Sequence, residues 1–386
     1  MNDSAQREGL PRVQAVVDGV DHRSRRWRSI RRWLGRALLT AVAIIVTGLA
    51  GFPTGRYLVR AAWEESLILM HRRDIAEVMA DSGVSARTRS SLELVLAART
   101  YAAESLGLQT GRSFTQFTQL ERDTLVLVLS SAEQDALRRH TWWFPIVGRV
   151  PYKGYFDFEA ARLAELEHRA RGLDTQLRPA SAFSTLGWFN DPLLSTTLQL
   201  DSLELVNTVI HELVHNTFYA SGQAVFNESF ANFAGSRGAA AFFRSRGQLL
   251  AAEEVDRRWS DEVAMGSFWS GLYRAVDSAF AAHPEGRAAR LRARVHVHRR
   301  WRRLLADSVA LGLSTISPRA VGRASFDNAA LLARRVYLTD LALFDSVLAR
   351  EQGSARRAIG WTITRAKADR NAPYASVRAG LSGRAQ

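Results

Sequence analysis

The sequence contains no cysteine, which excludes disulfide bonds and thiolate metal ligands and leaves the cellular compartment open. Lysine is nearly absent too, because only Lys153 and Lys367 occur among 52 basic residues. Arginine therefore supplies almost all of the positive charge behind the formal net charge of +14. No internal repeat and no recognised nucleic-acid-binding module accompanies this charge, so the charge does not indicate a nucleic-acid partner. The 386 residues, 47% of them hydrophobic, suffice for one large core.

The densest group of arginines lies in residues 287–303, around His296 and His298. A run of this kind is most often the solvated face of a helix, and the alternative is contact with anionic lipid headgroups. The arginines are Arg287, Arg290, Arg292, Arg294, Arg299, Arg300, Arg302 and Arg303.

A motif with a defined chemistry occurs at residues 211–215, which read HELVH and so have the HExxH pattern. On a helix, residues four apart lie one turn above each other, so His211 and His215 can bind one metal ion. Glu212 projects about 100° further round the helix, where it can act as general base on a water molecule at that metal. The alternative is a structural helix with coincidental histidines, but apolar residues at helical spacing surround the motif and favour the metal site.

The third ligand is expected from the next helix, where Glu228 follows a short Ser221-Gly222 turn. Two imidazoles and one carboxylate leave a fourth tetrahedral position open for water, as in catalytic zinc sites. We therefore expect one zinc ion per chain. If Glu228 is not the ligand, Glu204 and Asp191 are the next candidates.

Two further residues are candidates around this metal. Asn232, four residues after Glu228, could orient a ligand histidine through its free ring nitrogen, or could be an ordinary surface amide. Tyr219, four residues after His215, would continue the metal-facing stripe and could stabilise an oxyanion, or could be a core tyrosine.

Several segments together resemble a bacterial family of predicted aminopeptidases. They are PYKGYF at 151–156, STLGWFNDPLL at 184–194, the HExxH helix, FNESFA at 226–231 and, more loosely, NAAL at 328–331. The resemblance covers roughly residues 85–350 and is more specific than HExxH alone. It implies a membrane-associated zinc metallopeptidase of the gluzincin type with a zincin-like fold. Members often begin with a lipoprotein signal, but this chain has no cysteine that could be lipidated.

The N-terminal region offers a different means of anchoring. Residues 37–55 are 19 positions without a charge, which is about the length of a membrane-spanning helix. Arginines at residues 23–36 precede this segment and are expected to stay in the cytoplasm, which would place the rest of the chain outside. This predicts a single-pass protein of the bacterial inner membrane whose catalytic domain faces the periplasm. A cleaved signal peptide, with Gly48-Leu49-Ala50 as the cleavage site, is the alternative.

The segments that carry the resemblance also contain candidate substrate-binding residues. Lys153 stands out because arginine has replaced nearly every other lysine, and it could bind a carboxylate of a peptide, unless it has merely survived by chance. Asp191 could bind a substrate amine. Tyr152, Tyr155 and Trp188 are the other candidates, and ordinary loop packing is the alternative for each.

The hydrophobic pattern predicts an α+β fold that is mostly α-helical, with a small sheet ahead of a long helical C-terminal half. Strands are expected at residues 124–129 and 175–183, and residues 142–150 are expected to form a loop or an edge strand. Helices are expected at residues 58–79, 86–106, 158–171, 203–219, 227–246, 249–282, 287–310 and 327–350.

The predicted organisation has four parts. They are a basic, disordered cytoplasmic leader (1–33), a transmembrane anchor or uncleaved signal (34–55), a zinc metallopeptidase domain (56–370) and a loose tail (371–386). The expected function is hydrolysis of peptide or protein substrates by metal-activated water, as an aminopeptidase. A zinc endopeptidase and a non-catalytic, membrane-tethered scaffold with a structural metal are the alternatives.

Overall fold

The computed structural model describes residues 33–37, 39–40, 42–43, 47–48, 51–144, 148–180 and 192–383. The chain forms two compact units, Met1–Glu65 and Ser66–Gln386. No helix within the described residues is both long and apolar enough to cross a membrane. Of the predicted membrane segment 37–55, residues 38, 41, 44–46, 49 and 50 lie outside the described residues.

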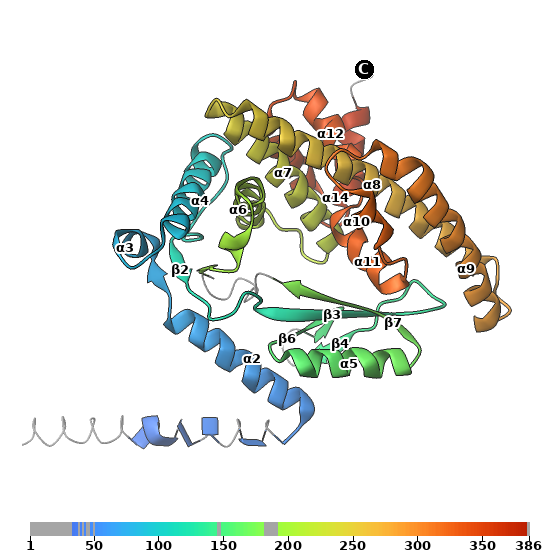
Figure 1. The fold of residues 1–386 in the computed structure, drawn as a ribbon, viewed down its shortest axis with the longest axis horizontal. Coiled ribbons are helices and arrows are strands. Elements are labelled where there is room, and N and C mark those ends of the chain that lie inside the picture. The colour runs from blue at the N-terminus through green and yellow to red at the C-terminus, as the bar shows by residue number, and fades with distance from the viewer. Residues whose placement is uncertain are drawn as a thin grey trace, which may run out of the picture. The chain divides into compact units, whose positions relative to one another are not determined.

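The second unit is mostly helical and contains small sheets, which agrees with the predicted α+β class (Figure 1). Its first half alternates short strands with helices, and its second half is almost entirely helical. The helices are α2 (Pro53–Met70, which begins in the first unit), α3 (Ile75–Ala80), α4 (Ala86–Glu104), α5 (Phe158–Ala170), α6 (Ser202–Thr217), α7 (Ala224–Ser245), α8 (Leu249–Ala281), α9 (Arg287–Leu304), α10 (Pro318–Gly322), α11 (Asn328–Tyr337), α12 (Leu341–Arg350), α13 (Ala355–Ala368) and α14 (Pro373–Ser382).

The main sheet has the antiparallel strand order β6 (Tyr152–Tyr155), β3 (Val126–Glu133), β7 (Leu173–Ala180). Helix α5 packs on one face of this sheet and α11 packs on the other (Figure 1). Both faces of β3 are consequently covered, which explains why its apolar residues form a continuous run. The sheet therefore has an α5 face and an α11 face, and every side chain of its strands belongs to one of them.

Smaller strands complete the sheet structure. β1 (Arg73–Asp74) pairs antiparallel with β2 (Gln116–Thr118), and β2 pairs in parallel with β8 (Leu193–Leu194). A separate hairpin joins β4 (Trp142–Phe144) to β5 (Gly148–Val150), so residues 142–150 form two short strands.

Helices α6 and α7 form the centre of the larger hydrophobic core. Asp201 begins α6 by accepting hydrogen bonds from the backbone of Leu203 (3.0 Å) and Glu204 (2.9 Å), as an N-cap does. The apolar positions that predicted the helix are all buried, so α6 presents only one flank to solvent. Its last turn ends at Thr217, because Phe218 adopts an extended backbone conformation.

The two helices approach closely because α7 has glycine at the crossing. A β-carbon added at Gly235 would overlap the Asn207 side chain and lie 2.8 Å from the Asn207 carbonyl oxygen. It would also lie 3.2 Å from the Cβ of His211. Gly238, one turn further on, meets Ile210 in the same way, at 2.9 Å. Since Gly235 is seven residues after Glu228, both lie on the face of α7 that contacts α6.

Two predicted helices are interrupted. Residues 327–350 form α11 and α12 rather than one helix, because Asp340 adopts a positive φ of 53° at the start of α12. Residues 58–79 are likewise divided, because α2 ends at Met70 and β1 precedes α3. The hydrophobic periodicity on either side of each break is helical, so the pattern alone could not reveal them.

The prediction of a loose tail at residues 371–386 is also wrong for most of these residues. Residues Pro373–Ser382 form α14, with Val377 fully buried in the main core. Small, polar residues favour a loose segment, but small residues are also what close packing requires here. A β-carbon at Gly380 would lie 2.9 Å from the Trp361 ring of α13.

The close approach at Gly235 leads to a stability prediction. We expect Gly235→Ala to lower the free energy of unfolding by about 1–3 kcal/mol, because the added methyl group must push α6 away from α7. Gly360→Ala in α13 is the control, since no atom lies within 4 Å of a β-carbon there. That change should be neutral or stabilise by about 0.5–1 kcal/mol through helix propensity. Equal denaturant midpoints for the two variants would contradict the packing argument.

Candidate metal centre

Three side chains from α6 and α7 converge at one point. The Nε2 atoms of His211 and His215 lie 3.3 Å apart. The carboxylate of Glu228 reaches both imidazoles, with Oε2 3.4 Å from His211 Nε2 and Oε1 3.6 Å from His215 Nε2. These three residues are the one group of three or more potential ligands that come together within the described part of the chain.

The spacing of these donor atoms fits a tetrahedral metal. Zinc binds imidazole nitrogen and carboxylate oxygen at roughly 2.0–2.2 Å, so two ligands of a regular tetrahedron lie about 3.4 Å apart. The two imidazole nitrogens lie 3.3 Å apart, and each lies 3.4 or 3.6 Å from a different oxygen of the Glu228 carboxylate, so the spacings are close to that edge length. The donors therefore need little movement to bind such an ion.

The electrostatics of the three side chains also suit a cation. Burial would raise the pKa of Glu228, but hydrogen bonds from His211 and His215 outweigh burial and lower this pKa to about 2. Burial acts to lower the pKa of His211, yet Glu228 and the nearby carboxylates Glu212 and Glu204 raise it overall. The carboxylate is thus held ionised, and negative charge is concentrated where the imidazoles meet.

A buried asparagine fixes the connection between the two ligand helices. The side chain of Asn227 donates to the Ala220 carbonyl (2.8 Å) and accepts from the Ala220 amide (3.0 Å). Gly222, with a φ of 75°, supplies the left-handed turn between these partners. Because Asn227 directly precedes Glu228, these hydrogen bonds set the position of the carboxylate relative to α6.

The candidate ligand atoms remain accessible from solvent. The side chains of His211, His215 and Glu228 are 13%, 20% and 22% exposed. Glu212, between the two histidines, is exposed to solvent, and its position agrees with the predicted divergence from the ligand face. A substrate and a water molecule could therefore reach both the ligands and the carboxylate.

The two other residues predicted near the metal differ in their placement. Tyr219 does not continue the stripe of α6, because the helix has ended at Thr217, yet its ring centre still lies 6.3 Å from that of His215. It is 53% exposed and so is not a core tyrosine. The amide nitrogen of Asn232 donates to the carbonyl of Tyr337 at 3.1 Å. Its proposed role in orienting a histidine stays a prediction.

The predicted substrate-binding residues separate onto the two faces of the sheet. Tyr152 pairs with Ser130 of β3 and belongs to the α11 face. Burial is the main reason that the pKa of Tyr152 is raised, and the charges of Glu228 and Tyr219 raise it further. Lys153 and Tyr155 alternate with it and belong to the α5 face, where the Lys153 ammonium lies 5.0 Å from the Tyr155 ring centre. The structure thus brings Tyr152, but not Lys153 or Tyr155, toward the metal ligands.

Trp188 and Asp191 lie outside the described residues. Glu204, the other alternative third ligand, accepts a hydrogen bond from Asn207 (3.3 Å) and is not part of the ligand group.

Three residues near the ligands were not identified from the sequence. Arg178 of β7 and Tyr337 of α11 both belong to the group around Glu228. The pKa of Tyr337 is raised first by burial and then by the Glu228 charge, and the Arg178 charge acts to lower it. Glu262 of α8 is a partly exposed residue whose carboxyl lies among protein atoms, and its pKa is raised to about 7, first by burial of this group and then by Glu204. Strand alternation could have placed Arg178 on the face of Tyr152, but no local signal marks Tyr337 or Glu262.

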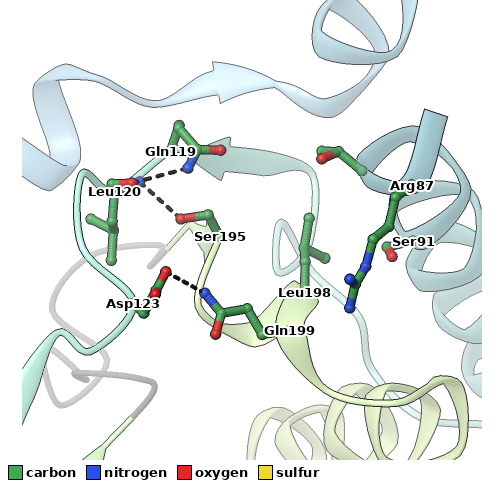
Figure 2. A pocket seen from close by; sticks show the side chains of 9 residues that line it. Arg87, Ser91, Gln119, Leu120, Asp123, Ser195, Leu198 and Gln199 are labelled. Atoms are coloured by element: carbon green, nitrogen blue, oxygen red, sulfur yellow. Dashed lines mark hydrogen bonds between the residues drawn. The ribbon is translucent and has the colours of Figure 1, made fainter. Parts of the chain in front are cut away.

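A different hollow lies between the start of α4, the segment after β2 and the 3₁₀ turn Thr197–Gln199 (Figure 2). In it, Gln199 donates to Asp123 (2.8 Å), and the Leu120 amide donates to the Ser195 hydroxyl (2.9 Å). Its lining holds a single carboxylate and no imidazole, so it offers no comparable metal site.

The hydrogen bonds of Asn227 lead to a second prediction. Asn227→Ala should lower the free energy of unfolding by about 1–3 kcal/mol, because it leaves the buried amide and carbonyl of Ala220 without partners. Zinc affinity, measured by competition with a chelator, should fall as well. Asn216→Ala is the control, since Asn216 makes a comparable hydrogen bond to Ser113 (2.8 Å) at the exposed end of α6. Its effect should stay within about 0.5 kcal/mol.

Comparison with known proteins gives one positive result. A family model described as Putative aminopeptidase matches residues 56–372, which is most of the chain. No curated protein and no solved structure matches the chain significantly.

Proposed function

Since the chain belongs to the putative aminopeptidase family, we propose that it is a zinc-dependent peptidase of the gluzincin type. In this proposal, His211, His215 and Glu228 bind one zinc ion, and Glu212 is the general base. The observation that carries the proposal is the convergence of the three side chains, whose imidazole nitrogens lie 3.3 Å apart and 3.4 or 3.6 Å from an oxygen of the Glu228 carboxylate, close to the ligand spacing of tetrahedral zinc.

When bound, zinc would polarise the scissile carbonyl and lower the pKa of a water molecule. The Glu212 carboxylate, exposed on the same turn of α6, accepts the proton of the attacking water and returns it to the leaving amine. Tyr219 and Tyr152 present phenol groups on the open side of the ligands, where they can donate to a substrate oxygen.

Two features favour catalysis over a structural metal. Structural zinc sites usually have four protein ligands that enclose the ion, whereas three ligands come together here within the described residues. The ligand side chains are also partly open to solvent, and a scaffold has no use for an exposed carboxylate between the two histidines. An endopeptidase remains the alternative within the same chemistry, and a peptide-library digestion read by mass spectrometry would distinguish the two.

We expect the purified protein to contain about one zinc ion per chain by elemental analysis. Glu228→Ala should lose both the zinc and the activity, because removal of one of three ligands weakens binding by several kcal/mol. Glu212→Gln should keep its zinc and lose turnover, since it removes only the base. Asn232→Ala should weaken zinc binding about tenfold if its side chain orients a histidine.

Glu253→Ala is a matched control for the loss of a carboxylate, because Glu253 is an exposed residue of α8. It should bind zinc and hydrolyse peptides like the original protein. Normal zinc binding by Glu228→Ala would remove Glu228 from the ligand set. A zinc-free protein that is folded and active would overturn the proposal as a whole.

We further propose that the protein is anchored in the bacterial inner membrane through the uncharged residues 37–55, with the peptidase domain in the periplasm. The support is the sequence pattern of a long apolar segment that follows a cluster of arginines. Peptides outside the cytoplasm would then be its substrates.

This topology leads to a further prediction. A reporter fused to the C-terminus should show activity characteristic of export, because the arginines before residue 37 stay in the cytoplasm. The same fusion without residues 1–55 should remain cytoplasmic and serves as the control. A cytoplasmic signal from the full-length fusion would contradict the orientation. A mature protein that begins near Gly51 would show cleavage instead of anchoring.

A further inference from the structure

Helix α11 and strand β7 bring a cationic residue, Arg178, toward the candidate metal centre. At one end of their contact, the Asn328 amide donates to the Asp174 carboxylate (2.8 Å). From there, Arg178 lies four residues further along β7, or about 13 Å. Tyr337 lies nine residues further along α11, or about 14 Å. Because the two elements advance by equal lengths, Arg178 and Tyr337 lie close together at the other end of this contact, where burial raises the pKa of the Tyr337 phenol and the nearby Arg178 charge acts to lower it.

The end of α11 is in turn fixed to α7 beside Glu228. The Ser229 hydroxyl donates to the Val336 carbonyl (3.3 Å) and accepts from the Thr339 amide (3.2 Å). The Asn232 amide donates to the carbonyl of Tyr337 (3.1 Å). Since Ser229 directly follows Glu228, these bonds hold Tyr337 next to the proposed metal ligand.

Arg178 and Tyr152 project from the same face of the sheet. Val128 and Ser130 are two residues apart on β3, so their side chains lie on the same face of the sheet. Val128 pairs with Arg178 and Ser130 pairs with Tyr152, so both partners lie on that face, the α11 face. Part of each residue's surface stays accessible to solvent, namely 51% of Tyr152 and 37% of Tyr337, and Arg178 is exposed. Within the described residues, no carboxylate lies at ion-pair distance from Arg178. Its guanidinium can therefore pair with an anionic group that enters from solvent on this face of the sheet.

We propose that Arg178, oriented by Tyr337 and flanked by Tyr152, binds a carboxylate of the substrate next to the scissile bond. A guanidinium presents paired N–H donors that match a carboxylate, and the phenol fixes its direction before the substrate arrives. The carboxylate is either the C-terminus of a short peptide or the side chain of an acidic residue. This inference rests on the proposed peptidase function and adds to it a preference for anionic peptides.

The test is a competition between matched peptides. The zinc-loaded, full-length protein is given tri- and tetrapeptides in free-acid and C-terminal-amide pairs, and amidated peptides that carry Glu or Gln at each position. Relative kcat/KM values are read by mass spectrometry. The original protein should prefer one anionic member over its neutral partner by about 10- to 100-fold, the equivalent of a charge-assisted hydrogen bond. The pair that shows the preference identifies the source of the carboxylate.

Variants assign this preference to the arginine. In Arg178→Gln the ratio of anionic to neutral substrate should collapse toward one, and Arg178→Lys should keep part of it. Tyr337→Phe should reduce the ratio by a smaller factor, because it removes only the group that orients the guanidinium. Arg162→Gln is the control, since Arg162 is an exposed residue of α5 on the other side of the sheet, and it should keep the full ratio.

Two outcomes would overturn the inference. The original protein could hydrolyse both members of every pair equally, or Arg178→Gln could lower both rates by the same factor. The second result would indicate that Arg178 stabilises the transition state of all substrates rather than selecting among them.

Failure of the peptidase proposal is distinguishable from failure of this inference. If the original protein hydrolyses none of the peptides, the proposed function is wrong. The proposed carboxylate-binding site is then tested by measuring peptide binding instead of hydrolysis. Calorimetric titration of zinc-loaded Glu212→Gln with the same free-acid and amide pairs should still show tighter binding of the anionic member. Loss of that difference when Arg178→Gln is added supports the subsite, and no difference at any stage overturns it.

Discussion

The contact between α6 and α7 at Gly235 is the constraint on which the candidate metal centre depends. Without a side chain there, the backbone of α7 lies directly against Asn207 and His211, and Glu228, two turns earlier, reaches both histidines. The hydrogen bonds of Asn227 then fix the connection that sets the register of the two helices. The position of the three candidate ligands thus depends on backbone packing, which is stiffer than an arrangement of flexible side chains.

Only one face of the sheet contributes side chains to the surroundings of the candidate metal centre. Its α11 face carries Tyr152 and Arg178 and adjoins the metal ligands, and its α5 face is occupied by an imidazole and aromatic cluster. In that cluster His140, Trp142 and His168 pack with ring centres 4.7 to 5.3 Å apart. Burial is the main reason that the pKa of His168 falls to about 4, so this histidine is neutral and structural. The alternation of β6 therefore decides which residues of the PYKGYF segment face the metal site.

The sequence was informative wherever the structure depends on local spacing. The HExxH helix, the following ligand helix and most element boundaries could be predicted, because helical periodicity and capping are properties of neighbouring residues. The contacts of Arg178 with Tyr337, and the proximity of Glu262 to His211, could not, since they join segments that are distant in the chain. The helix breaks before Asp340 and after Met70 depend on tertiary packing, as does the order of the tail around Val377.

The distribution of the ligands along the chain has a consequence for assembly. His211 and Glu228 are 17 residues apart, whereas Arg178 and Tyr337 are 159 apart. Closing the longer loop costs roughly 2 kcal/mol more in chain entropy by the logarithmic scaling of loop closure. The helical hairpin that carries the ligands can consequently form at an earlier stage of folding than the surface of β7 and α11 beside it. The proposed ligand hairpin is thus closed by a short loop, whereas the surface proposed to recognise the peptide is completed only when the two distant segments β7 and α11 meet.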